Sequence, residues 1–351
     1  MSPRPAAPKG ARIAVRSTEA MGTPGTLTRR RAALGLAAGT AAALAAPRLL
    51  AQEDKQPITL LVGAASSMDF TARLVADQLR EVLGRPVVVL SKLGAGGRVA
   101  LGELKRSAPD GRTLMFSTSS AFAIYPNIYN RLDYDPVADF SFIGGLCWFD
   151  VGLAASPQHS GIGDMRQLVD WAHAKGKDAV YGAAPGAGSS SHFVGIATAL
   201  ATGVPMTAVQ YKDSGVGLID LASGRLPILI TGTSPLVEMH KTGKIRILAV
   251  SGEQRSPLVP EVPTLVEAGV KVAIQNSAGL YGPAKMPREL IERLYAAMTP
   301  MLSKPDVVAR MTAQGMVPAP LDGPALAASL AQERRRFAQL VEASGYQRED
   351  A

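Results

Sequence analysis

Residues 58–90 read ITLLVGAASSMDFTARLVADQLREVLGRPVVVL. The apolar run at 58–62 is typical of a buried strand, and the run at 86–90 indicates a second one. Between them apolar residues recur at helical spacing, and we expect Asp69 to cap this helix and Gly84 to end it. The apolar positions of the helix are Leu74, Val75, Leu79, Val82 and Leu83. A strand, a helix and a second strand in this order predict a parallel sheet with a crossover helix.

The alternation of strands and helices continues along the chain. A third strand is expected at 113–117, after the turn Pro109-Asp110-Gly111. The remaining elements are expected at 165–174, up to Tyr181, from Ser191, at 228–231, at 245–251, at 287–302 and at 324–344. In the last helix the apolar residues Leu326, Leu330, Phe337 and Leu340 share one face. We therefore predict an α/β fold in which mostly parallel sheets are flanked by helices.

Length and charge narrow the class of protein. The 351 residues, 47% of them hydrophobic, suit about two domains of roughly 150 residues with a full core. The formal net charge is +8, but residues 1–51 contain eight Lys and Arg against the single acid Glu19. Of the totals of 37 basic and 29 acidic residues, 29 basic and 28 acidic residues remain in the other 300. Because the excess charge lies at the N-terminus, a nucleic-acid partner has no electrostatic support.

The first 51 residues have the pattern of an export signal. The basic segment Thr28-Arg29-Arg30-Arg31 precedes 15 small and apolar residues, 32–46, which are too few for a membrane span of roughly 20 residues. The paired arginines resemble a twin-arginine signal, but a small residue stands where a large apolar one is usual, so the general secretory route stays open. Cleavage is expected between Ala45 and Ala51, with Met21 as an alternative start and an uncleaved anchor as an alternative interpretation. We expect the protein to be exported.

Sequence signatures of catalysis and metal binding are missing. The glycine–serine pattern of a nucleophile elbow, Ser-x-x-Lys and His-Glu-x-x-His do not occur. The four histidines never lie three or four residues apart, as paired metal ligands on a helix would. Cys147 is the single cysteine, so no internal disulfide can form, and we expect it to be a small buried hydrophobe. We therefore predict no enzymatic activity, no cofactor and no metal.

Three loops rich in small and hydroxylated residues follow predicted strands, at 64–69, 117–120 and 182–190. The third contains Gly186-Ala-Gly-Ser-Ser-Ser-His192 and precedes a helix. It is either a tight turn with an N-cap serine or an anion site in which helix amides and serine hydroxyls donate to a ligand. The glycines at 94–97 also follow a strand, but they lack the third glycine of the dinucleotide-binding motif. Loops at the carboxyl ends of strands bind ligands in open α/β sheets, so these loops favour a binder of small carboxylates.

Seven segments, in their order along the chain, carry a family resemblance. They are KLGAGG at 92–97, APDGRTL at 108–114, YDPVADF at 134–140, Tyr181 with GSSSH at 188–192, VQYK at 209–212, GKIRILAV at 243–250, and RSP at 255–257 with VPT at 262–264. Each segment is weakly specific alone. The ordered set, which covers about residues 57–345, resembles the solute-binding proteins of tripartite tricarboxylate transporters, also called Bug receptors.

This resemblance implies a two-lobed periplasmic binding protein fold of type II, which closes on an organic acid by hinge motion. Lobe 1 would comprise residues 57–155 and 269–345 and lobe 2 residues 156–268, with crossings near Ala155 and Gly269. The receptor would be a monomer that delivers a small carboxylate to a membrane permease of two subunits. The alternative is a sensor module that binds a similar ligand and signals to a histidine kinase. Both functions would use the same ligand site.

The resemblance also implies which residues bind the ligand. In the family, a ligand carboxylate is held by backbone N–H groups and hydroxyls of the loop after the first strand, with bridging water. That loop corresponds to 64–69, and the segments 117–120 and 186–191 supply further contacts. Asp69 is expected to be a helix cap first and a partner for a ligand amine or bridging water second. The predicted ligand-binding residues are Ala65, Ser66, Ser67, Asp69, Ser117, Ser119, Trp148, Gly188, Ser189, Ser190, Ser191 and Thr231.

Several positions depart from the family's pattern and bear on the ligand. Gly63-Ala-Ala-Ser-Ser67 replaces a loop rich in proline and glycine, and one residue is inserted around Pro185. Thr231 stands where an acidic residue is common, and Ser277-Ala278 replaces an aromatic pair. Trp148-Phe149 occurs where small residues are common. These two rings either stack on an aromatic or apolar ligand or pack at the hinge.

Overall fold

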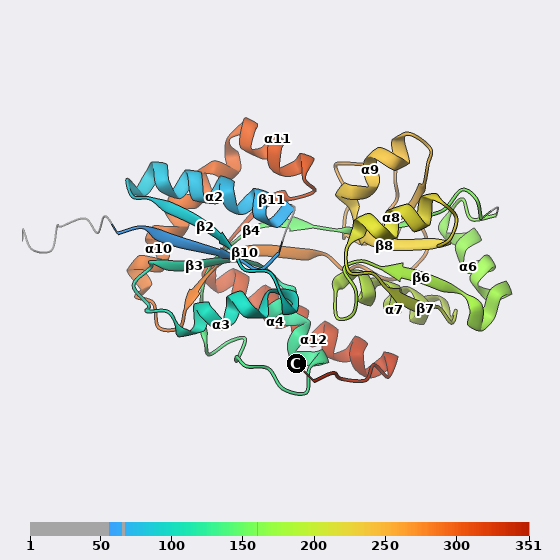
Figure 1. Cartoon of the computed structure of the whole chain (residues 1–351), viewed down its shortest axis with the longest axis horizontal. Helices are drawn as coiled ribbons and strands as arrows, with labels where there is room; N and C mark the ends of the chain where they lie inside the picture. Colours follow the sequence, from blue (N-terminus) through green and yellow to red (C-terminus); the bar gives the residue numbers. More distant parts are fainter. Residues whose placement is uncertain (1–55, 65–66, 160, 351) are drawn as a thin grey trace, which may run out of the picture. The chain divides into compact units, whose positions relative to one another are not determined.

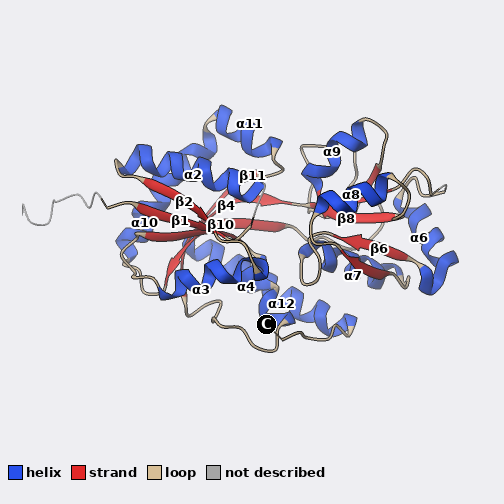
Figure 2. Ribbon diagram, viewed as in Figure 1, coloured by secondary structure: helices blue, strands red, loops and turns tan. Residues whose placement is uncertain are grey.

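The computed structural model describes residues 56–64, 67–159 and 161–350 of the chain. These residues form two β-sheets, each with helices on both faces (Figures 1 and 2). The predicted export signal in residues 1–51 lies outside the described residues, as do Ala65 and Ser66 of the predicted ligand-binding set.

The first sheet has six strands in the order β11-β4-β10-β3-β1-β2. Strands β1, β2 and β3 are parallel, whereas β10 runs antiparallel to both β3 and β4, and β11 runs antiparallel to β4. The bounds are β1 Ile58–Val62, β2 Val87–Ser91, β3 Thr113–Thr118, β4 Phe140–Phe149, β10 Asn276–Pro283 and β11 Val317–Asp322.

Helices cover both faces of the first sheet. Because alternate residues of a strand point to opposite faces, each strand contributes to a core on either side of the sheet. Leu60 and Val62 pack in a core with residues of α2 and α10, whereas Leu61 packs in a second core with residues of α3 and α12 (Figure 1). The bounds are α2 Ser67–Leu83, α3 Arg98–Arg106, α4 Ser120–Ala123, α5 Tyr125–Ile128, α10 Arg288–Met298, α11 Pro305–Ala313 and α12 Gly323–Ser344.

The second sheet has five strands in the order β7-β6-β8-β5-β9. Strands β6, β7 and β8 are parallel, and β5 runs antiparallel to β8 and β9. Ile228 and Ile230 face a core with α6 and α7, and Leu229 faces a core with α8 and α9. The bounds are β5 Val151–Ala155, β6 Val180–Ala183, β7 Thr207–Gln210, β8 Ile228–Gly232, β9 Arg246–Val250, α6 Met165–Lys175, α7 Ser190–Thr202, α8 Ser214–Ala222 and α9 Thr233–Lys241.

The predicted α/β class with helix-flanked sheets is confirmed, and the antiparallel strands mark where the chain passes between the sheets. Strand β4 of the first sheet continues into β5 of the second with only Asp150 between them. The chain returns through residues 251–275, between β9 and β10. By sheet membership the proposed lobes therefore meet at Asp150 rather than near Ala155, because β5 pairs with β8 and β9.

Two expectations about helix ends are wrong. Helix α2 begins at Ser67, so Asp69 lies inside its first turn and is not its cap. The helix expected at 287–302 ends at Met298 and tightens into a 3₁₀ turn, Thr299–Ser303. Pro300 in that turn has no N–H group to continue an α-helical ladder, which explains the change.

The glycine turn at 94–97 and the single cysteine both have packing roles. The glycine turn at 94–97 packs against the end of β1, where a Cβ atom on Gly63 would lie 2.5 Å from the Gly97 Cα atom. Gly97 has a φ of +91°, a conformation that favours glycine. Cys147 is buried with its Sγ atom 3.9 Å from the Met316 Sδ atom, and burial raises the pKa of its thiol to about 12. Its prediction as a small buried hydrophobe is confirmed.

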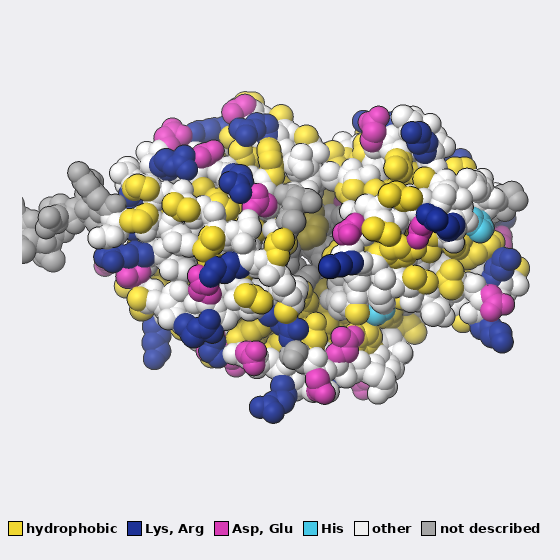
Figure 3. Space-filling view, in the orientation of Figure 1, with side chains coloured by type: hydrophobic (Ala, Val, Ile, Leu, Met, Phe, Trp, Pro, Cys, Tyr) yellow, Lys and Arg dark blue, Asp and Glu magenta, His cyan; other side chains and the backbone are white. Residues whose placement is uncertain are grey.

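The surface carries charges of both signs. On the face drawn in Figure 3, Lys and Arg side chains alternate with Asp and Glu side chains over both sheets' helices. This mixture matches the near balance of 29 basic and 28 acidic residues after residue 51. None of the helices within residues 56–64, 67–159 and 161–350 combines the length and the apolar character that crossing a membrane requires.

Candidate functional site

The first group of predicted site residues lies at one edge of the first sheet. Val62 at the end of β1 is in register with Phe116 of β3, so both parallel strands end at the same edge. Ser67 and Asp69 follow β1 at the start of α2, and Ser117 lies near the end of β3. This edge is where an open α/β sheet presents its ligand-binding loops.

Asp69 forms hydrogen bonds with residues of α2 and β2. Its carboxylate accepts hydrogen bonds from the Arg73 Nε atom, at 2.8 Å, and from the Ser91 hydroxyl. These hydrogen bonds lower the pKa of Asp69 below its usual value. Asp69 is therefore an ionised residue that joins the start of α2 to the end of β2.

Ser119 has a hydroxyl that is fully buried and already bonded. It donates to the Glu333 Oε1 atom at 2.9 Å and accepts from the Ser277 backbone N–H at 3.3 Å. Ser119 stays in the predicted set, but within the described residues its hydroxyl proton is directed at Glu333. Ser117 is also buried.

Glu333 is a residue that the sequence analysis missed. The residue is partly exposed, and its partial burial raises the pKa of Glu333 to about 7 against the opposing effect of the Ser119 hydrogen bond. A signal was present, because Glu333 lies three residues after Leu330 and four before Phe337, within the apolar stripe of α12. An acidic residue in such a stripe must either reach solvent or be buried with a partner.

The second group of predicted residues lies at the start of α7, after strand β6. Ser189 is the N-cap of this helix: its hydroxyl accepts from the His192 backbone N–H at 3.2 Å and donates to the Pro185 carbonyl. The Ser191 hydroxyl donates to the Ala184 carbonyl at 2.9 Å. Both hydroxyls therefore hold the loop, which confirms the interpretation as a capped turn for Ser189.

Ser190 is the residue of this loop that is left for a ligand. Within the described residues its hydroxyl makes no hydrogen bond, and the backbone N–H groups of Ser190 and Ser191 have no acceptor. A helix of 13 residues starts here, so its dipole adds to the attraction of these amides for an anion. The start of α7 can thus donate up to three hydrogen bonds to one carboxylate.

Contacts of Gly188 with His192 and Ile128 hold the loop before α7 in place. The His192 Nδ1 atom accepts from the Gly188 N–H at 3.4 Å, and burial lowers the pKa of His192, which favours the neutral ring that can accept. Gly188 has a φ of +73°, and a Cβ atom there would lie 2.5 Å from the Ile128 Cδ1 atom of α5. Gly188 therefore acts through its backbone and its small size.

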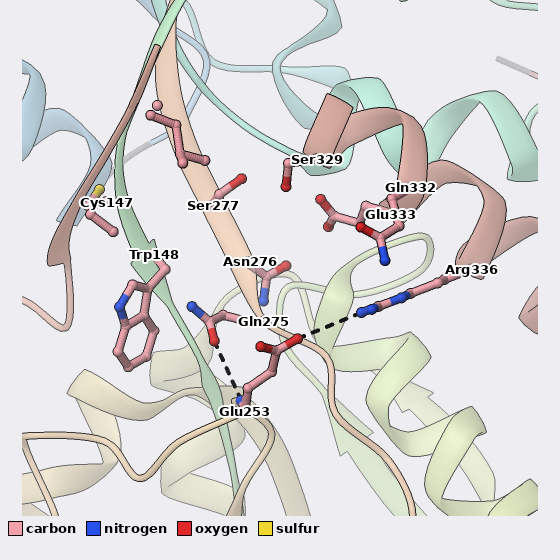
Figure 4. Close-up of a pocket in the computed structure, with 13 residues that line it drawn as sticks. Cys147, Trp148, Glu253, Gln275, Asn276, Ser277, Ser329, Gln332, Glu333 and Arg336 are labelled. Atoms are coloured by element: carbon pink, nitrogen blue, oxygen red, sulfur yellow. Dashed lines mark hydrogen bonds and ion pairs between the residues drawn. The ribbon is translucent and has the colours of Figure 1, made fainter. Parts of the chain in front are cut away.

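Thr231 and Trp148 complete the predicted set. Thr231 is buried near the end of β8. The preceding residue, Ile230, is in register with Ala183 at the end of the parallel strand β6. Thr231 therefore lies at the same edge of the second sheet as the loop that leads from β6 into α7. Trp148 is near the end of β4, is 7% exposed, and lines a cavity at the start of β10 (Figure 4). Among the predicted residues, only Trp148 lines that cavity.

The structure places most of the described predicted residues in two groups, one at the edge of each sheet, whereas Trp148 lines the cavity at the start of β10. A buried apolar cluster joins α7 to other elements: it contains Ile124 and Ile128 from α4–α5, Phe193 from α7, and Phe337 and Val341 from α12. No group of three His, Cys, Asp or Glu side chains suited to a metal ion occurs within the part of the chain that the structure describes. The donors present are amides and hydroxyls, which suit an anion.

Comparison with known proteins identifies the family. Residues 71–346 match the family model described as the tripartite tricarboxylate transporter family receptor. The chain belongs to this family. Among curated relatives of this receptor, a UPF0065 protein of Cupriavidus necator is 32% identical over 279 residues, which cover 78% of this chain and 84% of that protein. Protein BugT of Bordetella pertussis is 28% identical over 91% of this chain and 98% of its own length.

Solved structures of similar proteins share the fold, and two of them hold a carboxylate. The Rhodopseudomonas palustris protein Rpa4515 with adipate is 25% identical, has a TM-score of 0.75, and covers 83% of this chain and 98% of its own. MatC of the same organism with bound malate is 26% identical, has a TM-score of 0.70, and covers 81% and 98% of the two chains. The periplasmic binding protein BugD is 25% identical with a TM-score of 0.72, over 84% and 99% of the two chains. The predicted family and the predicted fold class are confirmed.

Proposed function

We propose that this chain is a periplasmic receptor that captures a small organic carboxylate and delivers it to the membrane subunits of a tripartite transporter, without converting it chemically. The observation that carries the proposal is the start of α7, where two backbone N–H groups and the Ser190 hydroxyl are free within the described residues. Such donors bind a carboxylate without a neutralising cation, so the acid can also be released.

The family supplies independent support for the class of ligand. Rpa4515 and MatC hold adipate and malate, two dicarboxylates of different length. The predicted ligand-binding residues of both sheets would contact one acid, with Ser67 and Ser117 on one side and Ser190 on the other. This arrangement would couple binding to hinge closure, because each sheet contributes part of the site.

A thermal-shift screen tests the ligand class. The purified protein is heated with mono-, di- and tricarboxylates, including aromatic acids, and with the matching alcohols as controls. An acid present at about 100 times its dissociation constant should add about 2.7 kcal/mol to the free energy of unfolding and raise Tm by several degrees. A receptor for another kind of solute would give no hit among the acids, and the proposed ligand class would then be abandoned.

Replacing Ser190 with alanine should weaken binding of the acid found in that screen. We expect a loss of about 1–3 kcal/mol in binding free energy, because one hydrogen bond to a charged acceptor disappears. The matched control is Ser214→Ala, which removes a hydroxyl from the same first position of α8, where Asp213 already caps the helix. Equal affinity of Ser190→Ala and the wild type by calorimetric titration would show that α7 does not hold the carboxylate.

Transport and signalling are separated in cells. Deletion of the gene should abolish uptake of the labelled acid while leaving transcriptional responses to it intact. Loss of the response with normal uptake would instead identify the sensor that signals to a histidine kinase.

A further inference from the structure

A cavity of about 250 Å³ lies between the start of β10, the end of β4 and the middle of α12 (Figure 4). Glu253, from the segment that follows β9, closes one side of it. Its wall is mixed, with apolar surface from Trp148, Cys147 and Leu321 beside a set of polar side chains. The polar lining residues are Glu253, Gln275, Asn276, Ser277, Ser329, Gln332, Glu333 and Arg336.

Asn276 is the feature of this cavity that points to a ligand. The residue is 0% exposed, and neither its side-chain nitrogen nor its side-chain oxygen has a hydrogen-bond partner within the described residues. A buried amide costs free energy unless it is paired, and native proteins pair almost all such groups. Figure 4 shows its side chain in the cavity, between β10 and Glu333 on α12. A bound molecule with an N–H donor would supply a partner for the side-chain oxygen of Asn276.

The charges around the cavity indicate what kind of molecule fits. The carboxyl group of Glu333 uses one oxygen to accept from Ser119. Arg336, on the same helix, is directed instead at Glu253, with 3.7 Å between its Nη1 atom and the Glu253 Oε1 atom. With Glu333 ionised, the two acids and one arginine leave the cavity with one uncompensated negative charge. Within the described residues no Lys or Arg forms an ion pair with Glu333, and Arg336 affects it only as a nearby charge.

We propose that this cavity binds a small ligand through a primary ammonium group. An ammonium has three N–H donors. One N–H group would donate a hydrogen bond to the second carboxylate oxygen of Glu333 and another to the side-chain oxygen of Asn276. The third would donate to a neighbouring hydroxyl or amide oxygen. The alkyl part of the ligand would lie against the apolar face of the Trp148 ring. The proposal does not depend on carboxylate binding at α7, because the cavity shares only Trp148 with the residues predicted for that function.

The two tryptophans of the chain, Trp148 and Trp171, give a direct reporter and an internal control. In ¹⁵N-labelled full-length protein, each contributes one indole N–H signal, and Trp148→Phe assigns them. The probe is butylammonium chloride at pH 8, where Glu333 is ionised, with butanol and tetramethylammonium chloride as the matched probes. Butanol has the same chain without the charge, and tetramethylammonium has the charge without N–H donors.

We expect butylammonium to shift the Trp148 signal to saturation and to leave the Trp171 signal in place, with both control probes at least about tenfold weaker. Asn276→Ala and Glu333→Gln should each weaken butylammonium by about tenfold or more, whereas Glu292→Gln, an exposed change on α10, should not. Asn276→Ala removes an unpaired group and Glu333→Gln is isosteric, so both variants are expected to fold. A non-saturable shift, or equal binding by wild type and both variants, would overturn the proposal.

Discussion

Phe193→Ala should lower the free energy of unfolding by about 3–5 kcal/mol, the usual cost of removing a large buried aromatic side chain. Phe193 is 0% exposed and lies in α7, which packs with the second sheet. Its ring makes an edge contact with Phe337 of α12, with ring centroids 5.6 Å apart, and a tilted contact with Tyr346 at 5.4 Å. The variant therefore removes the aromatic centre of the cluster that joins elements of both sheets.

The matched control for this variant is Leu200→Ala on the same helix. Leu200 is 46% exposed, so its truncation should change stability by well under 1 kcal/mol, roughly the range seen for surface substitutions. Urea unfolding of the three proteins measures both changes. If Phe193→Ala were as stable as Leu200→Ala, the cluster would not hold α7 to α12.

Glu333→Gln should stabilise the protein at pH 8 and change its stability little at pH 5. Burial raises the pKa of the Glu333 carboxyl to about 7 in the folded protein, above its usual value of 4.5. The folded state therefore binds the proton more tightly than the unfolded state, and stability is lost as the pH rises through about 7. The loss is on the order of 3 kcal/mol at pH 8. Glutamine stays neutral and still accepts the Ser119 hydrogen bond, so it avoids this loss.

The measurement is urea unfolding of both proteins at pH 5 and pH 8. Burial also raises the pKa of Asp150, to about 6, so the wild type and the variant share a second contribution of the same sign, which cancels in their difference. Glu292→Gln, whose carboxylate is exposed beside Arg288, controls for loss of a surface charge. An equal difference between wild type and Glu333→Gln at both pH values would contradict the effect of burial on this carboxyl.

Strong periodicity explains how much of the fold the sequence predicts. The apolar run at 58–62 and the helical spacing up to Gly84 locate β1 and α2 closely, because both faces of β1 and one face of α2 are buried. The antiparallel directions of β5 and β10 are not predictable in this way. An apolar run has the same pattern whether its strand is parallel or antiparallel to its neighbours. The directions of β5 and β10 depend instead on where the chain passes from one sheet to the other.

The candidate site is predictable only where its chemistry is local. The N-cap at Ser189 and the first turn at Ser190 follow from a glycine–serine loop before a helix, which is a local signal. Glu333 meets Ser119 across 214 residues of chain, and Asn276 is unpaired only because of what surrounds it in three dimensions. Long-range contacts of this kind leave little trace in one sequence, apart from the acidic residue within the apolar stripe of α12.

The central claim, that a carboxylate is held at the start of α7, is tested most directly by hydrogen–deuterium exchange. The amides of Ser190 and Ser191 have no acceptor within the described residues, so they should exchange fast in the free protein. With the acid from the thermal-shift screen at saturation, we predict slowed exchange in the peptide that covers residues 186–192. Binding of the acid with unchanged exchange in this peptide would contradict the claim.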